Sequence, residues 1–448
     1  MDLNVLIKKF GLEDYRKVLI PEWDDSGKTF PEQGMLFFLT AEYINKVSNK
    51  AGLGDETVIS LLDIVKRVAA DRELSRLVWH IYHLLFVSEK GSERNGAEMP
   101  DFSEVLGADV SVFNLLLALS GFRTGEALFS KLGIPNEVAN GTFRDISIWC
   151  NYFQNELNFT GINLRILGWT HKLLYGSLYR LGRLQFGVRP FHGEVYVFRR
   201  KSDGRVHTLA KEGINFNSAG QYNGVDGLFD TSGVWHSELR RKHNAVTGNP
   251  ISLRGFAENR FITLELTEWD EVLAQGDPIL DIHIPGSGRM TVGACAESIA
   301  MAAEFFPKYF PNKPFKGYAC HSWFLDIQYE KLLPVTSNIL CFQHEFYLYP
   351  IKEGASESLW RIFGPNGLKG GLAHAPRKSQ MQQMVATFLE QGGHLRGGGA
   401  FFLTADLPWG WQVYRKQNGC AKQKTSVSKL DNPARVRANH WHGTKPYV

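Results

Sequence analysis

The stretch Ile279-Leu-Asp-Ile-His-Ile-Pro285, followed by Gly286-Ser-Gly-Arg289 and by the apolar run 294–310, decides the fold. Its first part is a short β-branched run typical of a strand, its middle is a glycine-containing loop, and its last part has helical spacing. His283 lies on the opposite strand face from Ile282 and Ile284, because side chains alternate along a strand. The stretch therefore predicts a strand, a tight loop and a helix that starts near Cys295.

The chain on both sides of this stretch continues with strands and helices. Downstream, the pattern predicts strands at 316–326 and 340–350 with a helix between them, then a helix at 380–393 and a last strand at 399–403. Upstream, short β-branched and aromatic runs begin at about Ser177, and Gly, Asn, Ser and Asp dominate 207–260, which we interpret as an insertion. These patterns predict a mixed-sheet domain with helices over 177–405.

The first third of the chain has a different period. Apolar residues recur at three- and four-residue spacing, as in Leu74, Leu77, Val78, Ile81 and Leu84, and similar stripes lie before and after them. This spacing predicts an all-helical domain over 1–176. The segment 406–448 is basic, has little periodicity, and is expected to be a flexible tail. The predicted fold class is therefore α+β, with a helical domain preceding a sheet domain.

Composition narrows the class of protein. The 448 residues are 44% hydrophobic and 21% charged, as in an ordinary globular protein of two or three domains. A net charge of +4 is too small to indicate a nucleic-acid or membrane surface, and no run of about 18 uncharged apolar residues predicts a membrane span. The N-terminus lacks the apolar core of a secretory signal, so we expect a cytoplasmic protein whose five scattered cysteines stay reduced.

Several motifs, in order along the chain, resemble the bacterial two-domain acyltransferases. In that family a helical N-acyltransferase N-terminal domain precedes a GNAT-like C-terminal domain. The resemblance covers about 177–403, while the helical front part agrees in type rather than in motif. It implies a GNAT-like sheet and transfer of an acyl group, most simply acetyl, from coenzyme A to an amine. The motifs are 179–186 (YRLGRLQF), 269–277 (WDEVLAQGD), Ile282-His-Ile-Pro285, 304–306 (EFF), 320–325 (CHSWFL), 332–334 (LLP), 337–339 (SNI) and Phe342-Gln343.

The resemblance also implies where acetyl-CoA or another acyl-CoA binds. GNAT folds hold it where two neighbouring parallel strands splay apart, with the pantetheine arm paired to the first strand and the pyrophosphate at the N-terminus of the next helix. A helix N-terminus after the glycine loop would present N–H groups and a positive dipole end to an anion. The candidate binding residues are Ile282, Ile284, Gly286, Ser287, Gly288, Arg289, Met290 and, for the pantetheine or the acceptor, Asn338.

Direct acyl transfer to an amine requires a base, a proton source for the thiolate and hydrogen-bond donors for the oxyanion. His283 is a candidate base or water relay. His321 and Ser322 alternate faces on the next strand, and our working assignment makes His321 the base and Ser322 a polar orienter. Tyr329 stands where the resemblance implies a tyrosine near the thiol. A purely structural role stays open for each of these residues.

Other kinds of site find little support. Cys320, His321, Cys341 and His344 supply metal-ligand types but lack paired spacing, and a strand would put the last two on opposite faces, so no metal is expected. The chain has no Walker motif, dinucleotide fingerprint or serine-hydrolase elbow. A catalytically silent acyl-CoA-binding or regulatory module stays open, because the pyrophosphate motif at 289–294 is imperfect. The expected acceptor is an amine-bearing small molecule or protein.

Overall fold

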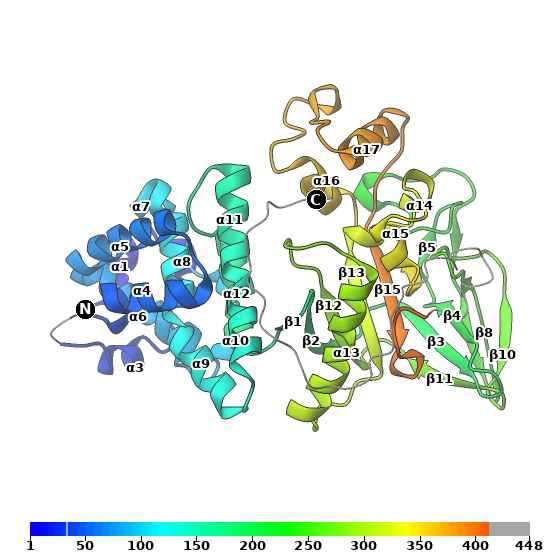
Figure 1. The fold of residues 1–448 in the computed structure, drawn as a ribbon, viewed down its shortest axis with the longest axis horizontal. Helices are drawn as coiled ribbons and strands as arrows, with labels where there is room; N and C mark the ends of the chain where they lie inside the picture. Colours follow the sequence, from blue (N-terminus) through cyan, green and yellow to red (C-terminus); the bar gives the residue numbers. More distant parts are fainter. Residues whose placement is uncertain (33–34, 412–448) are drawn as a thin grey trace. The chain divides into compact units, whose positions relative to one another are not determined.

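A computed structural model describes residues 1–32 and 35–411. It divides into two compact units (Figure 1). The first comprises Met1–Gly187 with Phe305–Pro311, and the second comprises Val188–Glu304 and the chain from Asn312 onward. Most of the predicted tail, 412–448, lies outside the described residues.

The first unit is helical, as predicted, and also contains β1 (Tyr179–Leu181) and the first part of β2 (Leu184–Pro190), which pair as an antiparallel hairpin. Asp71 begins α6 by accepting hydrogen bonds from the N–H groups of Glu73 and Leu74, and the apolar stripe of that helix is buried. The helices are α1 (Leu3–Lys9), α2 (Arg16–Leu19), α3 (Trp23–Lys28), α4 (Ala41–Ala51), α5 (Asp55–Ala70), α6 (Arg72–Phe86), α7 (Ser103–Leu106), α8 (Val110–Ser120), α9 (Phe122–Lys131), α10 (Asn136–Phe143), α11 (Asp145–Leu157) and α12 (Leu164–Leu174).

One helical run of the described residues, Ser103–Lys131, is long and apolar enough to cross a membrane by length and composition. In the structure, 72% of its most apolar window is buried inside the protein. The run contains α8, whose residues from Ser111 to Ser120 are all buried. Packing in the core of the helical unit therefore accounts for its apolar character.

The second unit is built on a mixed sheet, and its folding confirms the α+β class. Its strands β12 (Pro278–His283), β13 (Gly317–Ser322), β15 (Gly398–Leu403) and β14 (Tyr347–Pro350) are neighbours in that order. β12 and β13 run parallel, as their crossover through α13 (Val292–Tyr309) requires, and the other two pairs are antiparallel. Helices α14 (Tyr329–Leu332), α15 (Asn338–Gln343), α16 (Ser356–Phe363) and α17 (Gln380–Glu390) follow β13.

One face of this sheet shares a core with a smaller sheet. Ile279, Ala319 and Phe401 from the mixed sheet are buried with Val197 and Leu273 from the smaller one. The smaller sheet has the order β11 (Trp269–Leu273), β3 (Val195–Arg200), β4 (Val206–Ala210) and β9 (Pro250–Ile251). The predicted insertion carries short strands of its own, namely β5 (Asn215–Phe216), β6 (Trp235–His236), β7 (Leu239–Lys242) and β8 (Ala245–Gly248), the last of which pairs with β10 (Ile262–Glu265).

The predicted strand at 340–350 is wrong in its first half. Ser337 accepts a hydrogen bond from the N–H of Leu340 and caps α15, so the chain stays helical to Gln343 and β14 begins only at Tyr347. Cys341 and His344 therefore lie on a helix and at its C-terminal end. The argument that a strand would separate them across two faces does not apply.

Gly161 is a sharp test of packing in the helical unit. It lies at φ +105° between Thr160, which accepts a hydrogen bond from the Ser111 hydroxyl, and Ile162, whose N–H donates to the Ser111 carbonyl. A Cβ at this position would overlap the Ser111 carbonyl and lie 2.6 Å from the Val112 nitrogen. Gly161→Ala is expected to destabilise the protein by more than about 1 kcal/mol in urea unfolding, because both strain and overlap oppose it.

Gly133→Ala is the matched control, since Gly133 also has a positive φ of 67° but has no atom within 4 Å of an added Cβ. It isolates the cost of the backbone conformation, about 1 kcal/mol. Equal destabilisation by the two substitutions would contradict the close contact at Ser111.

Candidate functional site

The candidate site begins where the ladder between β12 and β13 ends. The parallel register pairs Ile279 with Gly317 and continues to Asp281 and Ala319. Both strands run on past this point, β12 to His283 and β13 to Ser322, and β13 stays paired with β15 over these residues. The carboxyl ends of two neighbouring parallel strands thus extend beyond their shared ladder, in agreement with the predicted splay.

An ion-pair cluster lies on β12 at this end. The Asp281 Oδ2 atom is 3.0 Å from His283 Nε2 and 2.9 Å from Arg189 Nη1. Desolvation acts to raise the pKa of Asp281, but the hydrogen bonds and charges of His283 and Arg189 outweigh it and lower the pKa below its usual value. Asp281 is therefore an ionised carboxylate that holds the His283 imidazole.

A second imidazole lies across β13. His321 Nε2 is 2.6 Å from the hydroxyl oxygen of Tyr349, which is fully buried on β14. The two residues are not on adjacent strands: Gly399 of β15 pairs with His321 on one side and with Tyr349 on the other. Because the middle position has no side chain, the tyrosine ring crosses β15 and reaches the histidine.

The two members of this pair differ in exposure, since His321 is exposed at the end of β13 whereas Tyr349 is fully buried. Desolvation lowers the pKa of His321; Asp281 opposes this shift, while His192 and Arg189 add to it. Burial raises the pKa of Tyr349 well above its usual value. At neutral pH His321 is therefore a neutral imidazole, and Tyr349 is a protonated hydroxyl.

The loop after β12 leads directly into α13. The helix begins at Val292, slightly before the predicted start near Cys295, and Thr291 caps it by accepting a hydrogen bond from the N–H of Ala294. Met290 is buried and its sulfur is 4.0 Å from that of Cys295, which anchors the end of the loop. Gly286, Gly288 and Arg289 are exposed and Ser287 is half-buried, so the loop presents backbone and a cation beside a helix N-terminus.

Other predicted site residues lie elsewhere. Ser322 points to the face opposite His321, as expected, and its oxygen accepts a hydrogen bond from Phe324 N–H to cap the short helix Trp323–Leu325. Tyr329 is fully buried in an apolar cluster with Leu340 and neighbouring residues, away from the His321–Tyr349 pair. Asn338 is exposed at the start of α15. The structure thus groups the two histidines on one sheet face but leaves these three residues outside the group.

Sequence reasoning missed three members of the group, Asp281, Arg189 and Tyr349. A signal for Asp281 exists, because it stands two residues before His283 and so shares its strand face. Arg189 and Tyr349 carry no local signal, since strand pairing alone brings them near. No group of three His, Cys, Asp or Glu side chains within 1–32 and 35–411 lies close enough to hold a metal ion.

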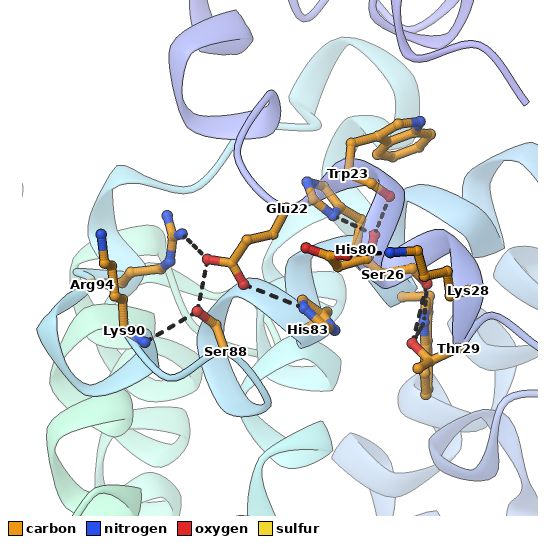
Figure 2. A network of polar contacts seen from close by, with 12 residues as sticks. Glu22, Trp23, Ser26, Lys28, Thr29, His80, His83, Ser88, Lys90 and Arg94 are labelled. Atoms are coloured by element: carbon orange, nitrogen blue, oxygen red, sulfur yellow. Dashed lines mark hydrogen bonds and ion pairs between the residues drawn. The ribbon is translucent and has the colours of Figure 1, made fainter.

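A separate polar network lies within the helical unit (Figure 2). Glu22, which has a positive φ of 59°, is 2.8 Å from Arg94, accepts a hydrogen bond from the Ser88 hydroxyl, and is 3.3 Å from His83 Nε2. Next to it, the buried His80 is bonded through Nδ1 to Ser26 and through Nε2 to the carbonyl of Leu19, and burial lowers its pKa to about 3. These contacts tie α3 to α6 and give the network a structural role.

The comparisons with known proteins agree with this architecture. Residues 178–402 match the model of the GNAT-like C-terminal domain, and residues 42–171 match that of the N-acyltransferase N-terminal domain. Among solved structures, an acyltransferase mutant in complex with octanoyl-CoA is similar over 90% of this chain and 99% of its own, at 20% identity and a TM-score of 0.62. An acyltransferase in complex with decanoyl-CoA and teicoplanin shares the same coverage and identity at a TM-score of 0.61. No curated protein sequence matches the chain.

The contacts of Glu22 predict that the folded protein loses stability in acid. Desolvation acts to raise the pKa of Glu22, but its bonds to Ser88 and Arg94 lower it below the ordinary value of 4.5. Because the folded pKa lies below the unfolded one, the stabilisation is complete above about pH 4.5 and is lost as pH falls through the folded pKa. Glu22→Gln is expected to lower the thermal midpoint at pH 7 and to make its fall below pH 4.5 shallower. An unchanged acid slope would contradict this role.

The crossing of β15 predicts a strong size limit at Gly399. A Cβ there would lie 2.6 Å from Cζ of Tyr349 and 2.8 Å from Cγ2 of Ile351. Gly399→Ala is expected to displace the Tyr349 ring, break its bond to His321 and cost about 1–3 kcal/mol in urea unfolding. Gly293→Ala in α13, where an added Cβ meets no atom within 4 Å, is the control and should not destabilise the protein, with an expected gain of up to about 1 kcal/mol. A crystal structure of the Gly399→Ala variant in which the Tyr349 hydroxyl still bonds His321 would contradict the predicted size limit at position 399.

Proposed function

Because the chain belongs to the acyltransferase family in which an N-acyltransferase N-terminal domain is joined to a GNAT-like C-terminal domain, we propose that it transfers an acyl group from acyl-CoA to an amine at the open ends of β12 and β13. The observation that carries the proposal is the end of the parallel ladder at Asp281 and Ala319, with His283 and His321 on the strand segments beyond it. The complexes of similar acyltransferases with octanoyl-CoA and decanoyl-CoA favour medium chains over acetyl as the acyl group.

The arrangement supports a binding mode for the thioester. Beyond Asp281, the backbone of β12 at Ile282 and His283 no longer pairs with β13, so a pantetheine amide can add to it as a further strand would. The loop 286–290 and the first turn of α13 then offer backbone N–H groups, Arg289 and a helix dipole to the pyrophosphate. In this mode the thioester carbon lies in the gap between the two strands.

The proposed chemistry follows from the Asp281–His283 pair. The amine nitrogen attacks the thioester carbon, and His283 accepts the proton that this nitrogen must lose. The carboxylate of Asp281, which bonds Nε2, orients the ring and stabilises the imidazolium that forms. Collapse of the tetrahedral intermediate breaks the C–S bond, and the thiolate takes up the proton held by the His283 imidazolium, so that the free thiol leaves and His283 is neutral again. His283 thus replaces His321 as the proposed base, because it is the histidine with a carboxylate partner.

We also propose a small-molecule amine as the acceptor and the cytoplasm as the compartment. A similar acyltransferase was crystallised with teicoplanin, which favours a small molecule over a protein acceptor. Cys150, Cys295 and Cys320 are buried and Cys341 is half-buried, and none of these four forms a disulfide, as expected in a reducing compartment. Cys420 lies outside the described residues.

Calorimetry with CoA, acetyl-CoA, octanoyl-CoA and decanoyl-CoA tests the co-substrate, and release of free thiol with a panel of amines tests turnover. The thioesters are expected to bind, with the medium chains tightest. His283→Ala should lower kcat by about 10²- to 10⁴-fold while leaving the dissociation constant of the thioester within a few fold. Asp281→Asn should also lower kcat, because the amide can donate to the ring and disfavour the required tautomer.

Asp270→Asn is the control, since Asp270 is an exposed carboxylate on β11 that pairs with Lys201. It should leave turnover unchanged. Failure of every thioester to bind folded protein would overturn the proposed function. Full turnover by His283→Ala would overturn the assignment of the base.

A further inference from the structure

The two histidines of the site differ in the kind of group that each one bonds. Asp281, an ionised carboxylate, can only accept a hydrogen bond, so the His283 nitrogen that faces it, Nε2, must carry a proton. In the neutral ring the other nitrogen, Nδ1, is then the acceptor. This tautomer suits a base, which is the role proposed for His283 above.

Tyr349 imposes the opposite tautomer on His321. The tyrosine is fully buried, and among the described residues the partner of its hydroxyl is Nε2 of His321, at 2.6 Å. A buried hydroxyl that failed to donate would leave its proton without a partner, at a cost of about 1–3 kcal/mol. The Tyr349 hydroxyl therefore donates to Nε2. The proton of the neutral His321 ring then sits on Nδ1.

We infer that His321 is a neutral hydrogen-bond donor that offers Nδ1–H to the carbonyl oxygen of the thioester, and that Tyr349 is the positioning residue that fixes this state. The inference rests on the proposed function, which places the thioester carbon between β12 and β13. No proton leaves His321 in the reaction: the amine proton goes to His283, and the negative charge that develops on the carbonyl oxygen is held by the Nδ1–H donor. The working assignment of His321 as the base is thereby replaced.

Packing around the tyrosine makes this arrangement rigid. Phe191 and Phe401 lie against the Tyr349 ring, with centroids 5.8 and 6.1 Å away, and the ring crosses β15 above Gly399. The His321 ring stands at 73° to it. Desolvation, the largest cause, lowers the pKa of His321 and so favours the neutral ring at neutral pH. A fixed donor of this kind stabilises charge without reorganisation during the reaction.

Nitrogen NMR of histidine-labelled protein reads the tautomers without any activity measurement. In the unmodified chain His321 is expected to carry its proton on Nδ1, and His283 on Nε2. Tyr349→Phe removes the donor and should move His321 toward the Nε2–H tautomer, with His283 unchanged. Tyr347→Phe, the same hydroxyl deletion two residues away on β14, is the control and should move neither ring. A His321 ring protonated on Nε2 in the unmodified protein would overturn the inference.

Kinetics separate a donor from a base. An asparagine at position 321 presents an amide N–H close to the place of Nδ1 but cannot accept a proton in the way that an imidazole does. His321→Ala is expected to lower kcat by about 10²- to 10³-fold, and His321→Asn to restore at least about a tenth of the original kcat. His283→Asn should remain as inactive as His283→Ala, because an amide cannot replace a base.

The outcomes distinguish the inference from the proposed function. If the thioesters bind and turn over but His321→Asn is no better than His321→Ala, the donor role is wrong and the acyltransferase site stands. If no thioester binds, the proposed function fails, and the NMR result still decides whether Tyr349 fixes the His321 tautomer. Loss of folding in the Tyr349 variant would show in its amide spectrum, and the His321 substitutions then carry the test.

Discussion

The end of the ladder between β12 and β13 is the constraint on which the candidate site depends. The two strands are hydrogen-bonded to one another as far as Asp281 and Ala319 and then continue separately. β13 stays in place because β15 pairs with it through Ser322. The backbone of β12 beyond Asp281 therefore does not pair with β13, while the strand alternation keeps His283 and His321 on one face. If β12 and β13 stayed hydrogen-bonded to their ends, the same side chains would lie on a continuous sheet with no gap between the two strands.

The polar groups of the site act as two matched pairs. Each pair joins an imidazole to one partner that decides where its proton lies: a carboxylate beside His283 and a phenol beside His321. Both pairs contain a histidine, so the chemical difference between the roles proposed for them comes from the second residue. Arg189 adds a fixed positive charge that keeps the carboxylate ionised. Two copies of one side chain can therefore carry complementary tasks within a single acyl transfer.

Much of the fold could be predicted from the sequence, because the local spacing of apolar residues indicates which segments form helices and strands. The stripe in α6, the strand–loop–helix order at 279–310 and the face of His283 all follow from spacing within a few residues. The strand expected from Leu340 failed because the hydroxyl of Ser337 caps a helical turn, and this local bond outweighed the aromatic composition that followed. Tyr329 lies outside the candidate site because its ring is buried in a separate apolar cluster.

The partners of the histidines could not be predicted, since they depend on strand order rather than on spacing. Arg189 reaches Asp281 from 92 residues away, and Tyr349 reaches His321 from 28 residues away across an intervening strand. Sequence patterns contain the alternation of faces but not the identity of the neighbouring strand. The missing information was therefore topological: the register of β15 between β13 and β14 supplied it for Tyr349, and the neighbouring positions of β2 and β12 supplied it for Arg189.

The glycine at the centre of that register has an evolutionary consequence. A side chain at position 399 and a tyrosine at position 349 compete for the same volume, and the tyrosine hydroxyl has its hydrogen-bond partner when a histidine stands at 321. Mutations at these three positions are thus coupled: a lineage that gains a larger residue at 399 is released from keeping the aromatic hydroxyl, and one that loses the histidine is released from keeping the glycine. Across relatives, the three alignment columns should change together rather than one at a time.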